Sequence, residues 1–325
     1  MDQSCRVKFP GELLAWRQQI PLPVAVVTGS FDLFQPGNLH VLEQARLLAK
    51  QVIVVVEPDD IAARHCSPGR PQNKLETRVE MVSFLRHVDA VTRVSLKEAG
   101  GFFSALAPYV WVTAKTQKER DPYAAAMASS VDRVVEVEPL EGCFTEDIIA
   151  AIAENRTPIK LPALCRPTHT PPRRGASMGD GQPPMTVTVN GCFDILHIGH
   201  LRFLAEARAL GDSLTVLINS DASVARYKGV TRPVFPEVFR AAALKALDCV
   251  SDVVVFQGDN PLDEMRQLRP HIHVKGGSYE PDRVRQEREL VESWGGHLVC
   301  TGMVEGFSTT GFIRKALGSK GAILV

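Results

Sequence analysis

Short apolar runs of strand length alternate with stretches of helical hydrophobic spacing along most of this 325-residue chain. In the first half of the chain, the pattern predicts strands over residues 24–28, 52–56, 90–94 and 109–113, and helices over residues 39–50 and 74–87. A strand, a helix and a second strand in succession form a parallel unit with a right-handed crossover. The alternation therefore predicts an open parallel α/β sheet.

The amino-acid composition of the chain changes between residues 158 and 184. This stretch contains seven prolines, an Arg173-Arg174 pair and a glycine-rich run over residues 175–181. Few of these residues are able to pack in a core, so the stretch is predicted to be a linker. It separates an expected first domain, residues 1–157, from an expected second domain, residues 185–325.

After the linker the same pattern starts again, at a constant displacement along the chain. Phe31-Asp32 recurs as Phe193-Asp194, and Arg70-Pro71 recurs at the same displacement as Arg232-Pro233. Near the C-terminal end the displacement grows by two positions. So many coincident positions over more than a hundred residues predict a tandem duplication of one α/β domain.

The second copy carries an apolar strand, a tight turn and a helix start over residues 185–210, and the turn contains His197 and His200. Glycines allow close backbone approach, helix-start amides point at an anion, and histidines add donors or positive charge, so the turn suits a phosphate. The first copy lacks this polar set, and we expect it to be catalytically silent, although His40 leaves a related role open. The replaced positions all bear a donor or a cation in the second copy: His197 becomes Gln35, His200 becomes Asn38, Lys228 becomes Cys66 and Lys275 becomes Thr113.

Composition narrows the class of protein. Lysine plus arginine equals aspartate plus glutamate at 37 each, so the overall charge indicates neither a nucleic-acid nor an acidic-membrane partner. The seven cysteines are scattered and contain no Cys-x-x-Cys pair, which argues against a disulfide framework and a structural zinc site. No apolar run has the length of a signal peptide core or a membrane span. These features predict a globular protein of a reducing cytoplasm.

Two segments carry a resemblance to a known family. Residues 191–200, Gly-Cys-Phe-Asp-Ile-Leu-His-Ile-Gly-His, and residues 305–310, Glu-Gly-Phe-Ser-Thr-Thr, resemble the cytidylyltransferase-like branch of the nucleotidyltransferase superfamily. Further likeness over residues 219–223, 228–234, 274–279 and 294–296 is to the heptose 1-phosphate nucleotidyltransferase domains of ADP-heptose synthases. The resemblance covers nearly all of residues 186–318, and the first copy shares it in degraded form.

The resemblance implies two tandem Rossmann-like domains with open parallel sheets, the second of them catalytic. It also implies attack by a sugar 1-phosphate, such as heptose 1-phosphate, on the α-phosphorus of a nucleoside triphosphate, ATP favoured, with release of pyrophosphate. His197, His200 and Lys228 would be catalytic, and Asp194 would hold Mg²⁺. The remaining expected contacts divide into nucleotide-binding residues, Gly191, Cys192, Phe193, Asp194, Gly199, Lys275, Gly276, Gly277, Ser308, Thr309 and Thr310, and substrate-binding residues, Arg232, Arg240 and Tyr279.

Several alternatives stay open at this stage. Arg232 and Arg240 would equally serve to pin a loop through a salt bridge, and Cys192 suits packing better than nucleophilic chemistry. Departures from the heptose pattern at Phe235, Phe239 and Ser278 leave the acceptor open. A CTP-dependent cytidylyltransferase for glycerol or ethanolamine phosphate is one alternative, and a non-catalytic nucleotide-binding scaffold is another. The two copies would form an intramolecular pseudo-dimer, or the chain a homo-oligomer.

Overall fold

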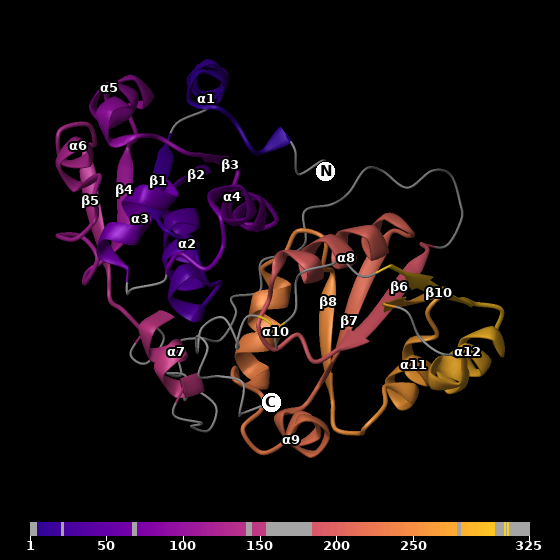
Figure 1. The fold of residues 1–325 in the computed structure, drawn as a ribbon. Coiled ribbons are helices and arrows are strands. Elements are labelled where there is room, and N and C mark those ends of the chain that lie inside the picture. The colour runs from indigo at the N-terminus through magenta and orange to yellow at the C-terminus, as the bar shows by residue number, and fades with distance from the viewer. Residues whose placement is uncertain are drawn as a thin grey trace. The chain divides into compact units, whose positions relative to one another are not determined.

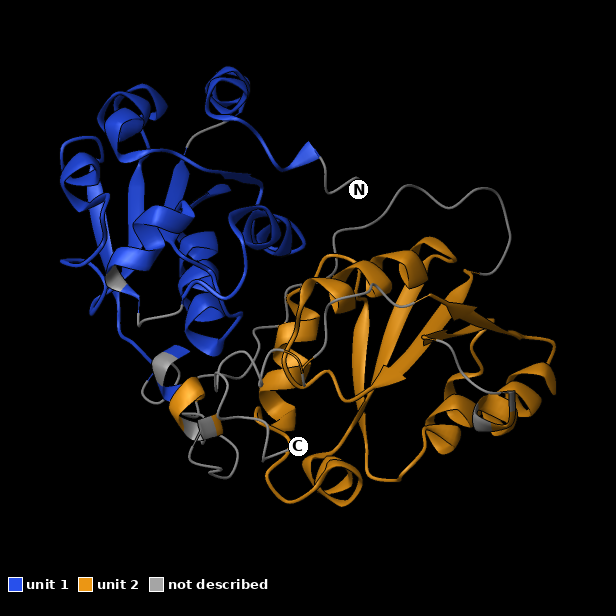
Figure 2. Cartoon of the chain, viewed as in Figure 1, with its two compact units in different colours: residues 1–147 blue, residues 148–325 orange. Residues whose placement is uncertain are grey.

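The structure, a computed structural model, describes residues 5–20, 23–66, 70–140, 145–153, 184–277, 281–302, 309 and 311. The chain clusters into two compact units, residues 1–147 (unit 1) and 148–325 (unit 2), which are coloured separately in Figure 2. All but the last residue of the expected linker, 158–184, lies outside the described residues. Among the described residues, no helix has the length and apolar character needed to cross a membrane.

Unit 1 is built on a five-stranded parallel sheet in the order β3-β2-β1-β4-β5 (Figure 1). Its strands are β1 (Val24–Gly29), β2 (Gln51–Val56), β3 (Ala90–Thr92), β4 (Val110–Ala114) and β5 (Arg133–Val137). The helices of this unit are α1 (Pro10–Arg17), α2 (Pro36–Leu48), α3 (Asp59–His65), α4 (Leu75–Ser83), α5 (Leu96–Leu106) and α6 (Ala124–Ala128). Helix α7 (Thr145–Ala153) crosses the division between the units.

Unit 2 has a second parallel sheet in the order β10-β9-β6-β7-β8. Its strands are β6 (Thr186–Gly191), β7 (Ser213–Asn219), β8 (Asp252–Phe256), β9 (Ile272–Gly276) and β10 (His297–Thr301). The helices are α8 (Ile198–Ala209), α9 (Asp221–Lys228), α10 (Glu237–Lys245), α11 (Leu262–Leu268) and α12 (Arg285–Glu292), with a 3₁₀ turn η3 (Pro281–Val284). Helix α8 packs on β6 and β7, α10 on β7 and β8, and α12 on β9 and β10.

The two units repeat one topology. Counted within its own unit, each sheet has the strand order 3-2-1-4-5, read from opposite edges. The displacement that takes Phe31 to Phe193 also takes the bounds of β1, α4 and β4 to those of β6, α10 and β9. A cis peptide bond precedes both Pro71 and Pro233, which occupy equivalent positions in the two copies. The structure thus confirms the tandem duplication and the two open parallel sheets expected from the sequence.

Strand order also fixes where a ligand site would lie. In each unit, the second strand pairs with one edge of the first strand, and the fourth strand pairs with the opposite edge. This reversal lies between β1 and β4 in unit 1 and between β6 and β9 in unit 2. In open α/β sheets, ligands bind outside the carboxyl ends of the strands at such a switch point.

Some helix boundaries differ from the predicted ones for identifiable reasons. Helix α2 begins three residues earlier than predicted, because the side chain of Gln35 caps its first turn, as that of His197 caps α8. The helix expected over residues 74–87 ends at Ser83. There the guanidinium of Arg6 donates to the carbonyls of Ser83 and Leu85, which replaces the continuing helical bonds.

Candidate active site

The turn between β6 and α8 is shaped by an aromatic ring folded over a glycine. Phe193 has a left-handed backbone with φ of 47°, and Phe31 repeats this with φ of 48° in unit 1. A Cβ at Gly191 would lie 3.0 Å from the Phe193 ring, so a larger residue there would displace the ring. The ring also meets His200 edge to face, with centroids 5.2 Å apart. Gly191 and Phe193 therefore set the path of the turn that carries the histidines.

Asp194 ties this turn to the loop that precedes α10. Its carboxylate accepts hydrogen bonds from Arg232 Nε at 2.7 Å and from the amides of Val234 and Phe235, each at 2.9 Å. The residue is only 3% exposed. Asp32 of unit 1 makes the same kind of bonds with Arg70 and two loop amides. This geometry revises the expected metal role of Asp194, because its oxygens are engaged by the scaffold, whereas the ligand role of Arg232 stays a prediction.

Arg240 lies at the centre of the same scaffold and is 1% exposed. Its guanidinium donates to the carbonyls of Cys192 and Asn219, both at 2.7 Å, and to the Asp221 carboxylate at 2.8 Å. The fully buried Arg78 of unit 1 likewise holds the carbonyl of the residue before Phe31 and an aspartate. Every donor group of Arg240 binds protein, so its expected substrate contact is revised to a clamp on the turn. The loop-pinning alternative is the one that the contacts favour.

His197 and His200 lie together at the start of α8. The rings stack with centroids 3.7 Å apart and planes 20° apart. His197 Nδ1 accepts from the backbone amide of His200 at 3.4 Å, which caps the helix and leaves the proton of the neutral ring on Nε2. Gly199 lies between them in the first turn. His197 thus presents an Nε2–H donor beside the free amides of the helix start, and the His200 ring stacks against it.

Burial keeps these two rings neutral. It lowers the pKa of His197 to about 4. It also lowers the pKa of His200 well below its ordinary value, and the charges of His197 and Lys228 act in the same direction against a smaller opposite effect of the Ile195 backbone. Both rings are therefore hydrogen-bond donors at neutral pH, and positive charge in the site comes from lysine.

Lys228 and Thr309 approach the histidines from distant parts of the chain. Lys228 is the exposed last residue of α9, and its charge reaches His200. The Thr309 hydroxyl donates to the carbonyl of Ile195 at 3.4 Å, in the turn that carries His197. The structure therefore brings these two expected site residues to the same turn. Ser308, Thr310 and Tyr279, also expected in the site, lie outside the described residues.

Lys275 is held at the carboxyl end of β9, across the switch point from the histidine turn. Its ammonium donates to Asn190 at the end of β6 at 2.8 Å and to the carboxylate of Glu287 on α12 at 2.7 Å. Lys275 and Glu287 side chains are each 10% exposed. Next to it, a Cβ at Gly276 would lie 3.0 Å from the Phe203 ring, and Gly277 has φ of 115°. This corner thus places a partly exposed glycine, Gly276, beside a fixed ammonium group.

Comparison with known proteins agrees with the duplicated architecture. The cytidylyltransferase-like family profile matches residues 26–158 and residues 188–314. The chain belongs to the cytidylyltransferase-like family. Both copies are therefore members, and the family assigns the chain to the nucleotidyltransferases.

Individual relatives match over the length of a single copy. The bifunctional protein HldE of Pelobacter propionicus is 51% identical over 131 residues, which is 40% of this chain and 27% of the relative. HldE of Geobacter sulfurreducens is 48% identical over 140 residues, 43% of this chain and 28% of the relative. The matched region is thus about a quarter of these relatives. A solved lipopolysaccharide core biosynthesis protein of Thermoplasma volcanium is 26% identical, covering 38% of this chain and 98% of that one, with a TM-score of 0.32.

The described residues do not fit a magnesium ion held by the protein. Asp194 has its oxygens occupied by Arg232 and two amides. Elsewhere in the described ranges, no group of three or more His, Cys, Asp or Glu side chains is placed to hold a metal.

Sequence reasoning missed the partners of the site residues. Glu287, the charge partner of Lys275, sits twelve positions along the chain on another element, and no local pattern marks it. Asn190 was visible as the counterpart of Thr28 but carried no motif of its own. Asn219 receives the Cys192 thiol at 3.7 Å, which agrees with a packing role for that cysteine. These contacts depend on tertiary pairing of strands and helices, which spacing along the chain does not reveal.

Proposed function

We propose that unit 2 transfers a nucleoside monophosphate from a nucleoside triphosphate, ATP favoured, to a sugar 1-phosphate such as heptose 1-phosphate. An acceptor phosphate oxygen forms a bond to the α-phosphorus, and the bond from that phosphorus to the bridging oxygen of the β-phosphate breaks. Pyrophosphate leaves with the electron pair of the broken bond. The observation that carries the proposal is the pair of stacked, neutral imidazoles at the N-terminus of α8, beside Lys228.

Such a transfer needs positioning and charge stabilisation more than covalent help from the protein. The Nε2–H group of His197 and the first amides of α8 are donors for phosphate oxygens, and the His200 ring stacks beside them. Because the rings are held by burial and stacking, they need little reorganisation as negative charge develops on the phosphates. Lys228, on an exposed helix end, supplies a point charge to the same oxygens.

The opposite corner of the site suits the nucleoside. Lys275 is fixed by Asn190 and Glu287, and the partly exposed Gly276 adds no side chain next to this ammonium group. The neighbouring switch point is where open α/β sheets bind nucleotides. We therefore assign the triphosphate to the histidine turn and the nucleoside to the Lys275 corner.

Two lines support the sugar 1-phosphate as acceptor: the sequence pattern shared with heptose 1-phosphate nucleotidyltransferase domains, and the HldE relatives near 50% identity. Sequence departures lie at Phe235 and Phe239, beside the loop held by Asp194. Both rings are buried and their centroids lie 4.7 Å apart, so the departures concern packing under that loop.

The test is release of pyrophosphate by the purified chain with ATP, CTP or GTP and heptose 1-phosphate, glycerol phosphate or ethanolamine phosphate. We expect ATP with heptose 1-phosphate to be the best pair. A preference for CTP with a polyol or amino-alcohol phosphate would replace the proposed substrates. Nucleotide binding without pyrophosphate release from any pair would refute the proposed catalysis.

A matched pair of variants tests the site itself. His200→Ala should lower kcat by about a hundredfold or more, the usual loss for a preorganised donor. Asn38→Ala changes the equivalent position of unit 1 and should leave kcat unchanged. Equal effects of the two substitutions would contradict the assignment of catalysis to unit 2.

A further inference from the structure

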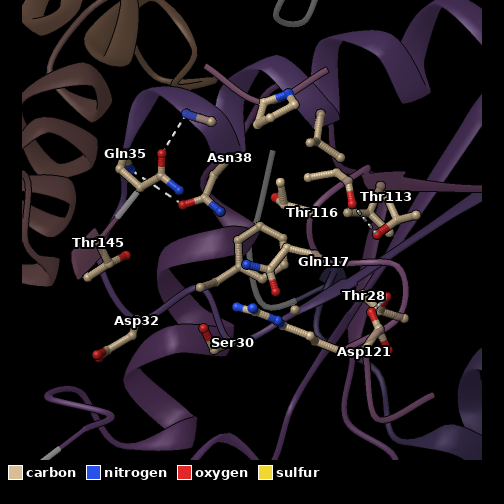
Figure 3. A pocket seen from close by; sticks show the side chains of 18 of the residues that line it. Thr28, Ser30, Asp32, Gln35, Asn38, Thr113, Thr116, Gln117, Asp121 and Thr145 are labelled. Atoms are coloured by element: carbon tan, nitrogen blue, oxygen red, sulfur yellow. Dashed lines mark hydrogen bonds between the residues drawn. The ribbon is translucent and has the colours of Figure 1, made fainter. Parts of the chain in front are cut away.

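Unit 1 retains a large cavity at the place where unit 2 has its candidate active site. The cavity has a volume of about 940 Å³ and is lined by the ends of β1 and β4 and by the start of α2 (Figure 3). This is the switch point of the unit 1 sheet. Its volume falls within the range of small-molecule sites. Loss of the histidines has therefore not closed the site.

The described residues around this cavity lack the phosphate-binding features seen in unit 2. At the start of α2, the Gln35 side chain accepts from the amide of Gly37 at 2.5 Å, and Asn38 caps the amide of Gln35 in return. The helix start is thus satisfied by its own side chains. Cys66 and Thr113 stand where unit 2 has lysines.

The charge of the lining is also unfavourable for an anion. Among the described residues that line the cavity, five are carboxylates and three are Lys or Arg. Of these cations, Arg70 forms a salt bridge with the buried Asp32 at 2.9 Å, and Lys115 forms one with Glu138 at 2.7 Å. Burial lowers the pKa of His40, so this histidine adds no charge at neutral pH. A triphosphate would meet net negative charge here.

Most of the other polar side chains that line the cavity are uncharged hydroxyls and amides. Figure 3 shows hydroxyls and amides from several elements around the cavity, among them Ser30, Thr116 and Gln117. Within the described part of the chain, these three side chains make no hydrogen bond, so they are available to a ligand. By contrast, Thr28 is already engaged with Asp121 and with the indole of Trp111.

We propose that unit 1 binds an uncharged, hydroxyl-rich ligand of nucleoside or sugar size, and that it excludes nucleotides bearing phosphates. Hydroxyls both donate and accept, so Ser30, Thr116 and Gln117 match a sugar ring without an ionic contribution. The site would give the chain a second ligand, distinct in charge from the substrates of unit 2. The proposal does not depend on the activity of unit 2.

Calorimetric titration of the full chain with adenosine, with free heptose and with ATP tests the proposal. We expect saturable binding of adenosine or heptose, and the two arms distinguish a nucleoside from a sugar. The double variant Ser30→Ala/Gln117→Ala should weaken that binding at least about fivefold, because two hydrogen bonds to the ligand are lost. The matched control Ser104→Ala, at an exposed position on α5, should leave it unchanged.

Each variant is also tested with the ligand of the other unit, which distinguishes the two sites. His200→Ala should leave binding of the neutral ligand unchanged, and Ser30→Ala/Gln117→Ala should leave the ATP affinity unchanged. The proposal is overturned if neither neutral compound binds, if the unit 1 double variant has no effect on their binding, or if that variant weakens ATP instead. Pyrophosphate release, measured separately, reports on unit 2 alone.

Discussion

His273 makes the stability of unit 2 depend on pH at a position where unit 1 has Trp111, which does not titrate. This residue on β9 is fully buried, and its Nδ1 lies 2.8 Å from the Thr188 hydroxyl on β6. Burial, helped by the charge of Lys275, lowers the pKa of His273 to about 3. The folded unit therefore holds this ring neutral, whereas the unfolded chain protonates it near the ordinary value of 6.5.

The sign and size of the effect follow from this difference. Between pH 6.5 and about 3 the unfolded state binds more protons at His273 than the folded state. The free energy of unfolding of unit 2 therefore falls as the pH falls through this window. One pKa unit corresponds to 1.36 kcal/mol, so His273 should cost unit 2 about 2 kcal/mol at pH 5 relative to pH 7.

The measurement compares the chain with a His273→Asn variant in urea, using pulsed hydrogen exchange and mass spectrometry to follow the peptides of each unit separately. The asparagine amide keeps a partner for Thr188 but does not titrate. We expect the variant to be less stable at pH 7 and to lose about 2 kcal/mol less than the original chain on going to pH 5. Unit 1, with Trp111 at the equivalent position, is the internal reference. An unchanged stability gap between chain and variant at both pH values would refute the reasoning.

Three further predictions rest on the same contacts. Glu287→Gln removes the carboxylate that pairs with the buried ammonium of Lys275 and should destabilise unit 2 by about 3 kcal/mol. The same exchange experiment measures this loss. A loss below about 1 kcal/mol would mean that water replaces the carboxylate. Arg240→Lys and Arg78→Lys should destabilise their own units to a similar degree. Only Arg240→Lys should lower pyrophosphate release. Lower pyrophosphate release in both variants would place activity in unit 1 as well. Because the pKa of His197 is about 4, kcat should not fall as the pH rises from 6 to 8; a fall of more than tenfold, read from initial rates, would show that a charged imidazole is required.

Much of the fold was predictable because its signals are local or repeated. Apolar runs mark the strands, and the constant displacement between the two copies fixes which segments are equivalent. The histidine turn was predictable for the same reason, since its motif is contiguous in sequence. Helix ends were less predictable. The end of α4 depends on Arg6, which lies 77 residues away from its acceptor Ser83.

The roles of charged residues in the site were the least predictable part. Asp194 lies within the histidine motif and Arg240 lies in a later helix, and their residue types suit a metal and a phosphate. Asp194 is paired with Arg232, 38 residues away, and Arg240 holds the carbonyl of Cys192, 48 residues away. Spacing along the chain does not say whether such a side chain faces the ligand or the scaffold. The direction is set by tertiary contacts, and in both cases it is toward the scaffold.

Comparison of the two helix starts separates the folding role of His197 from its chemical role. In unit 1 the equivalent Gln35 caps α2 through its side-chain oxygen, and in unit 2 His197 caps α8 through Nδ1. A glutamine therefore meets the structural requirement of this position. What the imidazole adds is a second nitrogen on the far side of the ring, which carries a proton while the first nitrogen caps the helix. Capping thus fixes the tautomer that donates, so the histidine is explained by the phosphate it would bind and not by the helix it begins.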